Sequence, residues 1–246
     1  MNAIKHIKTM KKFFLALLMV LVALPSCMAQ TAPSVSILGD SYSTFQYFLR
    51  PDTNEVWYWK GERDIRRTDV QKVTQTWWHQ LISQMGYRLC VNNSYSGATI
   101  SSTGYCPEGS AEHADYAPRS FVTRAPNLGC PDILFIFGAT NDSWAGSPIG
   151  EYKYADWTTD DLKSFRPAMA CLLQRISEYY PNVKVYFILN SELKDEINES
   201  VGTVCAHYGV PVIALHDIEK ISGHPSVKGM QAICAQVKAF IQQESK

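Results

Sequence analysis

The chain has 246 residues, of which 46% are hydrophobic and 12% aromatic, so it can bury a sizeable core and is not a disordered protein. Its 23 basic residues balance its 23 acidic residues. This composition offers no positive surface for nucleic acid or for an anionic membrane.

The N-terminus has the pattern of an export signal. Lys5, Lys8, Lys11 and Lys12 precede the apolar run "FFLALLMVLVAL", and "PSCMAQ" follows it. We predict a signal peptide over residues 1–29, cleaved after Ala29. Because this segment holds four lysines and no acids, the mature chain has 19 basic and 23 acidic residues, a formal charge of −4. The protein is then periplasmic or secreted. In the alternative, Cys27 carries a lipid anchor and the protein is a lipoprotein. No stable membrane insertion is expected, and the oligomeric state is left open.

Apolar runs alternate with helical patterns from residue 34 to the end. The runs are short and nearly continuous in hydrophobicity, which is typical of parallel strands covered on both faces. They lie at 34–38, 88–93, 132–138, 184–189 and 211–215. Helices are predicted over 70–86, 158–181, 192–209 and 226–243, with a kink at Pro167.

This alternation predicts an α/β fold with a parallel sheet and helices on both faces, in one domain over residues 30–246. Ligands of such folds bind at the carboxyl ends of the strands. The segments 46–69 and 101–127 fit the alternation poorly, and we interpret them as insertions that border the same edge.

Four chemically useful residues follow the predicted strands. Ser41 comes after the first strand, Gly97 after the second, Asn141 after the third and His224 after the fifth. A serine hydroxyl becomes a nucleophile when a base such as histidine accepts its proton. Backbone N–H groups of Ser41 and Gly97 and the amide of Asn141 can bind the oxyanion of a tetrahedral intermediate. His216 also follows a strand and is the rival candidate for the base.

These motifs resemble those of the SGNH hydrolases, the GDSL family of esterases and lipases. Gly39-Asp40-Ser41 matches the first block of that family, Gly97 the second, Gly138 to Asp142 the third and His224-Pro225-Ser226 the last. The resemblance implies a three-layer α/β/α fold of flavodoxin type with a central five-stranded sheet. It also implies ester hydrolysis without metal or cofactor. Ser41 would be the nucleophile, His224 the base, and Gly97 and Asn141 part of the oxyanion hole.

One position departs from the family pattern. Members usually carry an aspartate three residues before the histidine, whereas this chain has Ile221. The partner of His224 could be a backbone carbonyl near Ile221 or Ser222, which we favour slightly. It could also be the carboxylate of Asp217 or Glu219, or there could be no partner.

Aromatic side chains are frequent near the predicted site. Trp144 and Tyr42 are our candidates for substrate binding, because flat rings suit the faces of sugars. The alternative is that such rings only pin the long loops onto the domain. Cys106 and Cys130 both precede a proline in predicted loops, and we expect them to be the disulfide pair if one forms.

The pattern favours an exported serine esterase that removes small acyl groups, most plausibly acetyl, from carbohydrate. A small-molecule or glycan ester is then the substrate, and nucleic acid is not a partner. A lipase or lysophospholipase is the enzymatic alternative. A glycan-binding protein with little or no catalytic power is the alternative from another class.

Overall fold

The computed structural model describes residues 32–61, 67–105 and 116–244. Residues from Pro33 onward form one compact unit. The predicted signal peptide, its cleavage point and Cys27 lie outside the described residues. None of the described helices is long and apolar enough to cross a membrane.

A five-stranded parallel sheet forms the centre of this unit, as the sequence predicts. Its strands stand in the order β2-β1-β3-β4-β5, which is the flavodoxin-like order. Their bounds are Ser34–Gly39 for β1, Arg88–Ser94 for β2, Ile133–Gly138 for β3, Lys184–Leu189 for β4 and Val212–Ala214 for β5. A small antiparallel hairpin of β6 (Lys220–Ile221) and β7 (His224–Pro225) was not predicted.

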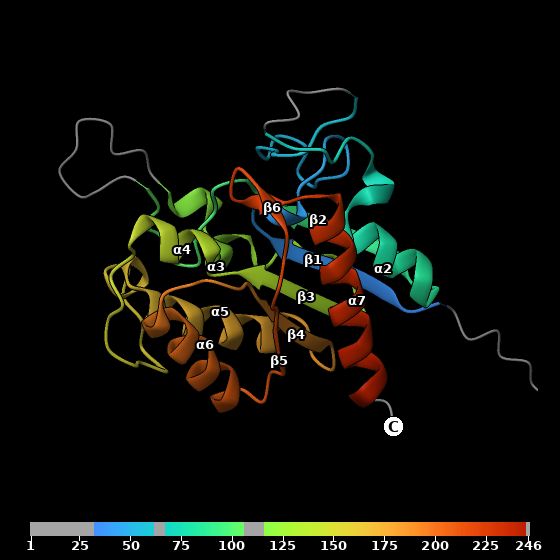
Figure 1. Cartoon of the computed structure of the whole chain (residues 1–246). Coiled ribbons are helices and arrows are strands. Elements are labelled where there is room, and N and C mark those ends of the chain that lie inside the picture. The colour runs from blue at the N-terminus through green and yellow to red at the C-terminus, as the bar shows by residue number, and fades with distance from the viewer. Residues whose placement is uncertain (1–31, 62–66, 106–115, 245–246) are drawn as a thin grey trace, which may run out of the picture. The chain divides into compact units, whose positions relative to one another are not determined.

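Helices cover both faces of the sheet, which gives three layers (Figure 1). One face packs against α2 (Trp77–Met85) and α7 (Val227–Glu244). The other packs against α3 (Phe121–Arg124), α5 (Phe165–Tyr179) and α6 (Asp195–His207). A short α4 (Thr140–Ala145) follows β3 directly. Four 3-10 turns complete the described elements: η1 (Ser41–Ser43), η2 (Val73–Gln75), η3 (Ala117–Arg119) and η4 (Asp161–Lys163).

The alternation of side chains along β3 explains the two cores. Phe135 and Phe137 point to the α2/α7 side, where both rings meet Trp77 edge-on. Leu134 and Ile136 point to the α5/α6 side. Because both faces are covered, every one of these residues can be apolar, and the strand is a continuous hydrophobic run.

The prediction of a kink at Pro167 is wrong. The long helix begins at Phe165 rather than at 158, so Pro167 is its third residue. The first N–H groups of a helix have no partner within it, and a proline there removes no hydrogen bond.

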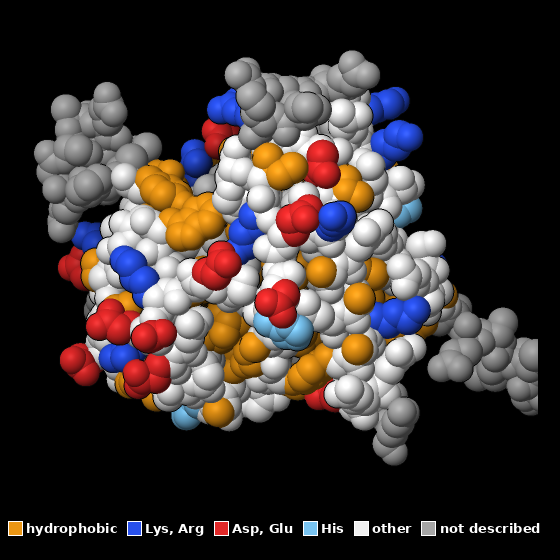
Figure 2. Space-filling model, in the orientation of Figure 1, with side chains coloured by type: hydrophobic (Ala, Val, Ile, Leu, Met, Phe, Trp, Pro, Cys, Tyr) orange, Lys and Arg blue, Asp and Glu red, His pale blue; other side chains and the backbone are white. Residues whose placement is uncertain are grey.

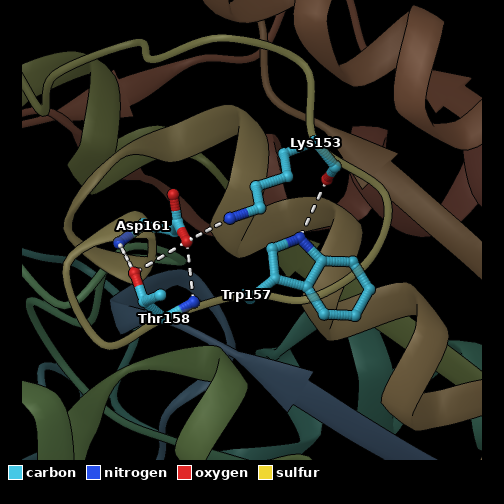
Figure 3. A network of polar contacts seen from close by, with 4 residues as sticks. All are labelled: Lys153, Trp157, Thr158 and Asp161. Atoms are coloured by element: carbon cyan, nitrogen blue, oxygen red, sulfur yellow. Dashed lines mark hydrogen bonds and ion pairs between the residues drawn. The ribbon is translucent and has the colours of Figure 1, made fainter.

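The segment before α5 is held by a compact polar network (Figure 3). The carboxylate of Asp161 accepts hydrogen bonds from Lys153 Nζ and from the backbone N–H and hydroxyl of Thr158, each at 2.7 Å. Trp157 Nε1 donates to the Lys153 carbonyl at 2.8 Å. The ring of Trp157 also packs against the core, so this ring pins the loop.

Arg124 ties the carboxyl ends of β1 and β2 together from inside the protein. Its buried guanidinium donates to the carbonyl of Gly39 at 3.2 Å, to that of Asn93, and through Nε to that of Arg119 at 2.8 Å. Burial lowers the pKa of Arg124 to about 9, and the nearby Asp40 opposes that shift.

We expect Arg124→Ala to lower the free energy of unfolding by about 3–5 kcal/mol, because it removes the hydrogen bonds of the buried guanidinium to three carbonyls and leaves Asp40 without a neighbouring positive charge. Urea denaturation followed by circular dichroism measures the change. Arg67→Ala, at an exposed position, is the control and should change the value by less than about 0.5 kcal/mol. Equal stability of the two variants would contradict this role.

Candidate active site

Ser41 begins the 3-10 turn that follows β1 directly. Asp40 caps this turn, since its Oδ1 accepts the backbone N–H of Tyr42 at 3.0 Å. Burial raises the pKa of the Asp40 carboxyl to about 7, despite that hydrogen bond and the nearby Arg124. Asp40 therefore acts on the turn, as its place in the sequence suggests, and holds Ser41 at the end of the strand.

His224 is presented by the β6–β7 hairpin. The two residues at its tip, Ser222 and Gly223, both have positive φ values, 49° and 77°, as in the two-residue turns that match the twist of a hairpin. The hydroxyl of Tyr42 donates to the Gly223 carbonyl at 2.6 Å, and that of Tyr58 to the Pro225 carbonyl at 2.9 Å. The hairpin is thus fixed on both sides of the histidine.

The structure brings Ser41 and His224 into hydrogen-bond contact, with 3.0 Å between Oγ and Nε2. On the other side of the ring, Nδ1 lies 3.0 Å from the carbonyl oxygen of Ser222. Because a carbonyl oxygen can only accept, the proton of the neutral imidazole must be on Nδ1. Nε2 then carries the free lone pair and can accept the proton of Ser41.

The partner of His224 is the slightly favoured one of the three possibilities, a backbone carbonyl, and it belongs to Ser222. Asp217 is wrong as a partner: its exposed carboxylate contacts the neighbouring His216 at 2.9 Å. Glu219 is wrong as well, since its Oε1 accepts the hydroxyl of Ser226 at 2.6 Å. Both carboxylates are therefore used elsewhere, and His216 does not compete with His224 for contact with Ser41.

Three candidate donors for an oxyanion come from the segments that follow β1, β2 and β3. In the described part of the chain, the backbone N–H groups of Ser41 and Gly97 donate to no protein acceptor. Gly97 has a φ of +76°, which favours glycine, and only Arg119 would approach a side chain placed there. The Asn141 amide donates to the Ala98 carbonyl at 2.9 Å, and its second N–H remains for a ligand.

Tyr105 is a site residue that sequence reasoning missed. Its hydroxyl donates to Oδ1 of Asn141 at 2.7 Å and so determines which end of the amide faces the site. No motif marks this tyrosine, although it lies in an insertion that we expected at this edge. The chain just before Tyr105 is attached to the segment before α5, because the Ser102 N–H donates to the Leu162 carbonyl at 2.9 Å.

Asp142 joins the two loops that carry Gly97 and Asn141. Its carboxylate accepts the backbone N–H of Ile100 at 2.7 Å and both the N–H and the hydroxyl of Ser101, at 3.1 and 2.8 Å. Asp142 therefore has a structural role: it holds the segments of Gly97 and Asn141 together.

Three aromatic rings surround His224. Trp57 stacks on the imidazole with 3.5 Å between centroids and 8° between planes, and Trp144 meets it edge-on at 5.9 Å. Trp144 is 44% exposed and can reach a substrate. Tyr42 cannot, because it is buried and its hydroxyl is used by the hairpin, so its predicted role in substrate binding is wrong. Its position makes it a support for His224.

This enclosure controls the protonation of the histidine. Burial lowers the pKa of His224 to about 4, although the hydrogen bond to Ser222 favours the charged form. The imidazole is consequently neutral at pH 7 and ready to accept a proton.

The described residues provide no evidence for a metal site or for the predicted disulfide. No group of three or more His, Cys, Asp or Glu side chains within them could hold a metal ion. Cys130 is an exposed free cysteine. Its predicted partner Cys106 lies outside the described residues, so that pairing stays a prediction.

With this geometry established, the comparisons identify the family. The family model described as GDSL-like Lipase/Acylhydrolase matches residues 33–241, which include all four candidate residues. The chain belongs to the GDSL-like lipase/acylhydrolase family.

Two solved structures of this family are closely similar. A protein from Bacteroides ovatus, classed as a GDSL-like lipase, is 59% identical; the match covers 87% of this chain and 100% of that one, with a TM-score of 0.82. Another from Bacteroides uniformis is 51% identical over 87% and 98% of the two chains, with a TM-score of 0.81.

More distant structures share the fold alone. One is a family two carbohydrate esterase from Clostridium thermocellum in complex with cellohexaose, at 14% identity and a TM-score of 0.54 over 86% of this chain and 64% of that one. A search of curated proteins gave no match.

We expect the imidazole of His224 to titrate near pH 4 in the native protein, and Trp57→Ala to move its pKa upward toward 6.5, because removing the indole admits water to the ring. NMR titration of a histidine-labelled sample measures both values. Tyr179→Ala, which removes an exposed ring from the last residue of α5, is the control and should leave the pKa unchanged. A pKa that is the same in wild type and Trp57→Ala would refute the role of the indole.

Proposed function

We propose that the protein is an exported serine esterase that hydrolyses carboxylic esters, with O-acetyl groups on carbohydrate as its substrates. The observation that carries the esterase assignment is the chain of contacts from Ser41 Oγ through His224 to the Ser222 carbonyl. The family assignment agrees with this chemistry, since acylhydrolases cleave acyl esters.

The reaction follows from the positions of these groups. Ser41 Oγ attacks the ester carbonyl while Nε2 of His224 takes its proton, and the carbonyl electrons move onto oxygen. The N–H groups of Ser41 and Gly97 and the Asn141 amide stabilise this oxyanion. His224 then protonates the leaving alcohol, and an acyl-enzyme remains. Water attacks the acyl-enzyme with His224 as base, which releases the acid and restores Ser41.

Two features support a small acyl group on a sugar. Ser41 is only 2% exposed, and its partner His224 is enclosed by the rings of Trp57 and Trp144, which favours a short acyl chain over a long one. The exposed Trp144 beside it offers a flat surface to a sugar ring. Export, for which the N-terminal sequence is the support, would bring the enzyme to polysaccharides.

A lipase is the second candidate, on the strength of the family name. An enzyme that works at a lipid surface usually offers that surface a broad apolar patch. On the face drawn in Figure 2, hydrophobic side chains form separate groups between charged and neutral polar ones. This face favours a soluble substrate.

We expect Ser41→Ala to reduce kcat on an aryl acetate by at least about 10⁴-fold, because the variant lacks the hydroxyl that forms the acyl-enzyme. Asp217→Asn should stay within about twofold of wild type, since the structure gives that carboxylate no contact with His224. Initial rates with aryl acetate, butyrate and octanoate check both points and the preference for acetyl. Full activity of Ser41→Ala would refute the role of Ser41 as the nucleophile. Absence of activity in the wild type together with sugar binding would favour the glycan-binding alternative.

Removing the Tyr105 hydroxyl should also slow the reaction. We expect Tyr105→Phe to lower kcat by about tenfold with little change in KM, because the Asn141 amide loses the hydrogen bond that orients it. Asn141→Ala, which removes the donor itself, should cost about 10²–10³-fold. Steady-state kinetics of the two variants and of the double variant test the coupling. If the two losses multiply in the double variant, Tyr105 does not act through Asn141.

A further inference from the structure

A pocket outside the catalytic groups lies in the segment that follows η1. It has a volume of about 540 Å³, and its lining includes the aromatic residues Tyr47 and Trp59 and, among its polar residues, Gln46, Asp52 and Glu55. Neither the reaction steps nor the support of His224 uses these five residues.

This pocket adjoins the oxyanion hole. The Glu55 carbonyl accepts the backbone N–H of Ser96, the residue before Gly97, at 3.0 Å. The Glu55 carboxylate also pairs with Arg119 Nη1 at 3.4 Å, and the same Nη1 lies 3.8 Å from the place where a Cβ on Gly97 would stand. Glu55, which lines the pocket, is therefore joined to the Gly97 loop by its own carbonyl and through its ion pair with Arg119.

This connection is rigid. The Arg119 guanidinium lies over the rings of Tyr95 and Tyr116, at 4.7 and 4.6 Å from their centroids. On the other side, the Gln46 N–H donates to the Tyr58 carbonyl at 2.9 Å, and Tyr58 itself supports the hairpin of His224. Pocket and catalytic groups are thus parts of one connected frame.

The lining has the chemistry of a sugar site. Tyr47 is 72% exposed and is held at a φ of +72°, a conformation that costs energy for a residue with a side chain. An exposed ring in such a conformation is available to stack on the apolar face of a ligand. Asp52, Glu55 and Gln46 offer planar groups that hydrogen-bond to hydroxyls. The two carboxylates would repel an anion, so the fitting ligand is neutral and rich in hydroxyl groups.

We propose that this pocket binds a sugar residue of the carbohydrate chain whose acetyl ester reacts with Ser41. The inference rests on the proposed function and extends it: the substrate is an oligosaccharide or polysaccharide that occupies a second subsite, rather than a single acetylated sugar. Stacking on Tyr47 and hydrogen bonds to Asp52 hold the chain while the ester enters the oxyanion hole.

A binding experiment tests the pocket apart from catalysis. The full chain with Ser41→Ala is titrated by calorimetry with unacetylated xylo-, manno- and cello-oligosaccharides of four to six units. We expect at least one series to bind, and the added Tyr47→Ala or Asp52→Ala to weaken it about tenfold or more. Tyr179→Ala, which removes an exposed ring next to the amino end of β4, is the matched control and should not change the affinity.

A kinetic experiment completes the test in the active enzyme. On acetylated oligosaccharides of the series that binds, Tyr47→Ala and Asp52→Ala should lower kcat/KM about tenfold, mainly through KM. On aryl acetate both variants should match wild type, which also shows that they fold.

The outcomes separate the two proposals. If oligosaccharides bind through Tyr47 and no sugar acetate is cleaved, the pocket stands and the proposed substrate of the enzyme falls. If sugar acetates are cleaved while both variants bind and react as wild type does, the pocket proposal is overturned and the function stands. Failure of every oligosaccharide series to bind also overturns the pocket proposal.

Discussion

The hydrogen bond between Nδ1 of His224 and the Ser222 carbonyl is the contact on which the site depends. It determines the tautomer of the imidazole, and only that tautomer leaves Nε2 free to take the proton of Ser41. A carbonyl is neutral and cannot stabilise the imidazolium as an aspartate does. The site has no charged partner for the imidazole. Instead, the two-residue turn at Ser222 and Gly223 places the Ser222 carbonyl within hydrogen-bond distance of His224 Nδ1.

Aromatic residues around the β6–β7 hairpin stabilise this contact between His224 and Ser222. Hydroxyls of Tyr42 and Tyr58 hold the carbonyls on either side of His224, and Trp57 covers its ring. This enclosure has a cost, because a buried imidazole is a weaker base than a solvated one. A base with a lowered pKa stays neutral over a wide pH range but gives less driving force for proton removal. In the proposed reaction, the oxyanion donors therefore supply a large part of the transition-state stabilisation.

A second set of buried polar groups positions those donors. Arg124 joins the ends of β1 and β2, and Asp142 joins the loops after β2 and β3. Ser41, Gly97 and Asn141 lie in the segments that follow β1, β2 and β3, which these two residues join. The carboxyl edge of a parallel sheet brings such loops near one another, and the buried arginine and aspartate turn that proximity into a fixed geometry.

The sequence by itself determined the five strands, their parallel arrangement and the four residues that meet at one edge, because strand and helix periods and the order of motifs are local properties of the chain. Tertiary structure decided what local patterns do not contain. Ile221 marks a missing aspartate, which slightly favours a nearby main-chain carbonyl in its place. Only the structure shows that the partner is the carbonyl of Ser222. Tyr105, Trp57 and Arg124 reach the site from irregular segments or from a short helix, where no periodicity predicts the direction of a side chain. Asp217, Glu219 and Tyr42 were misassigned for the same reason: nearness along the chain does not show which partner a side chain meets in space.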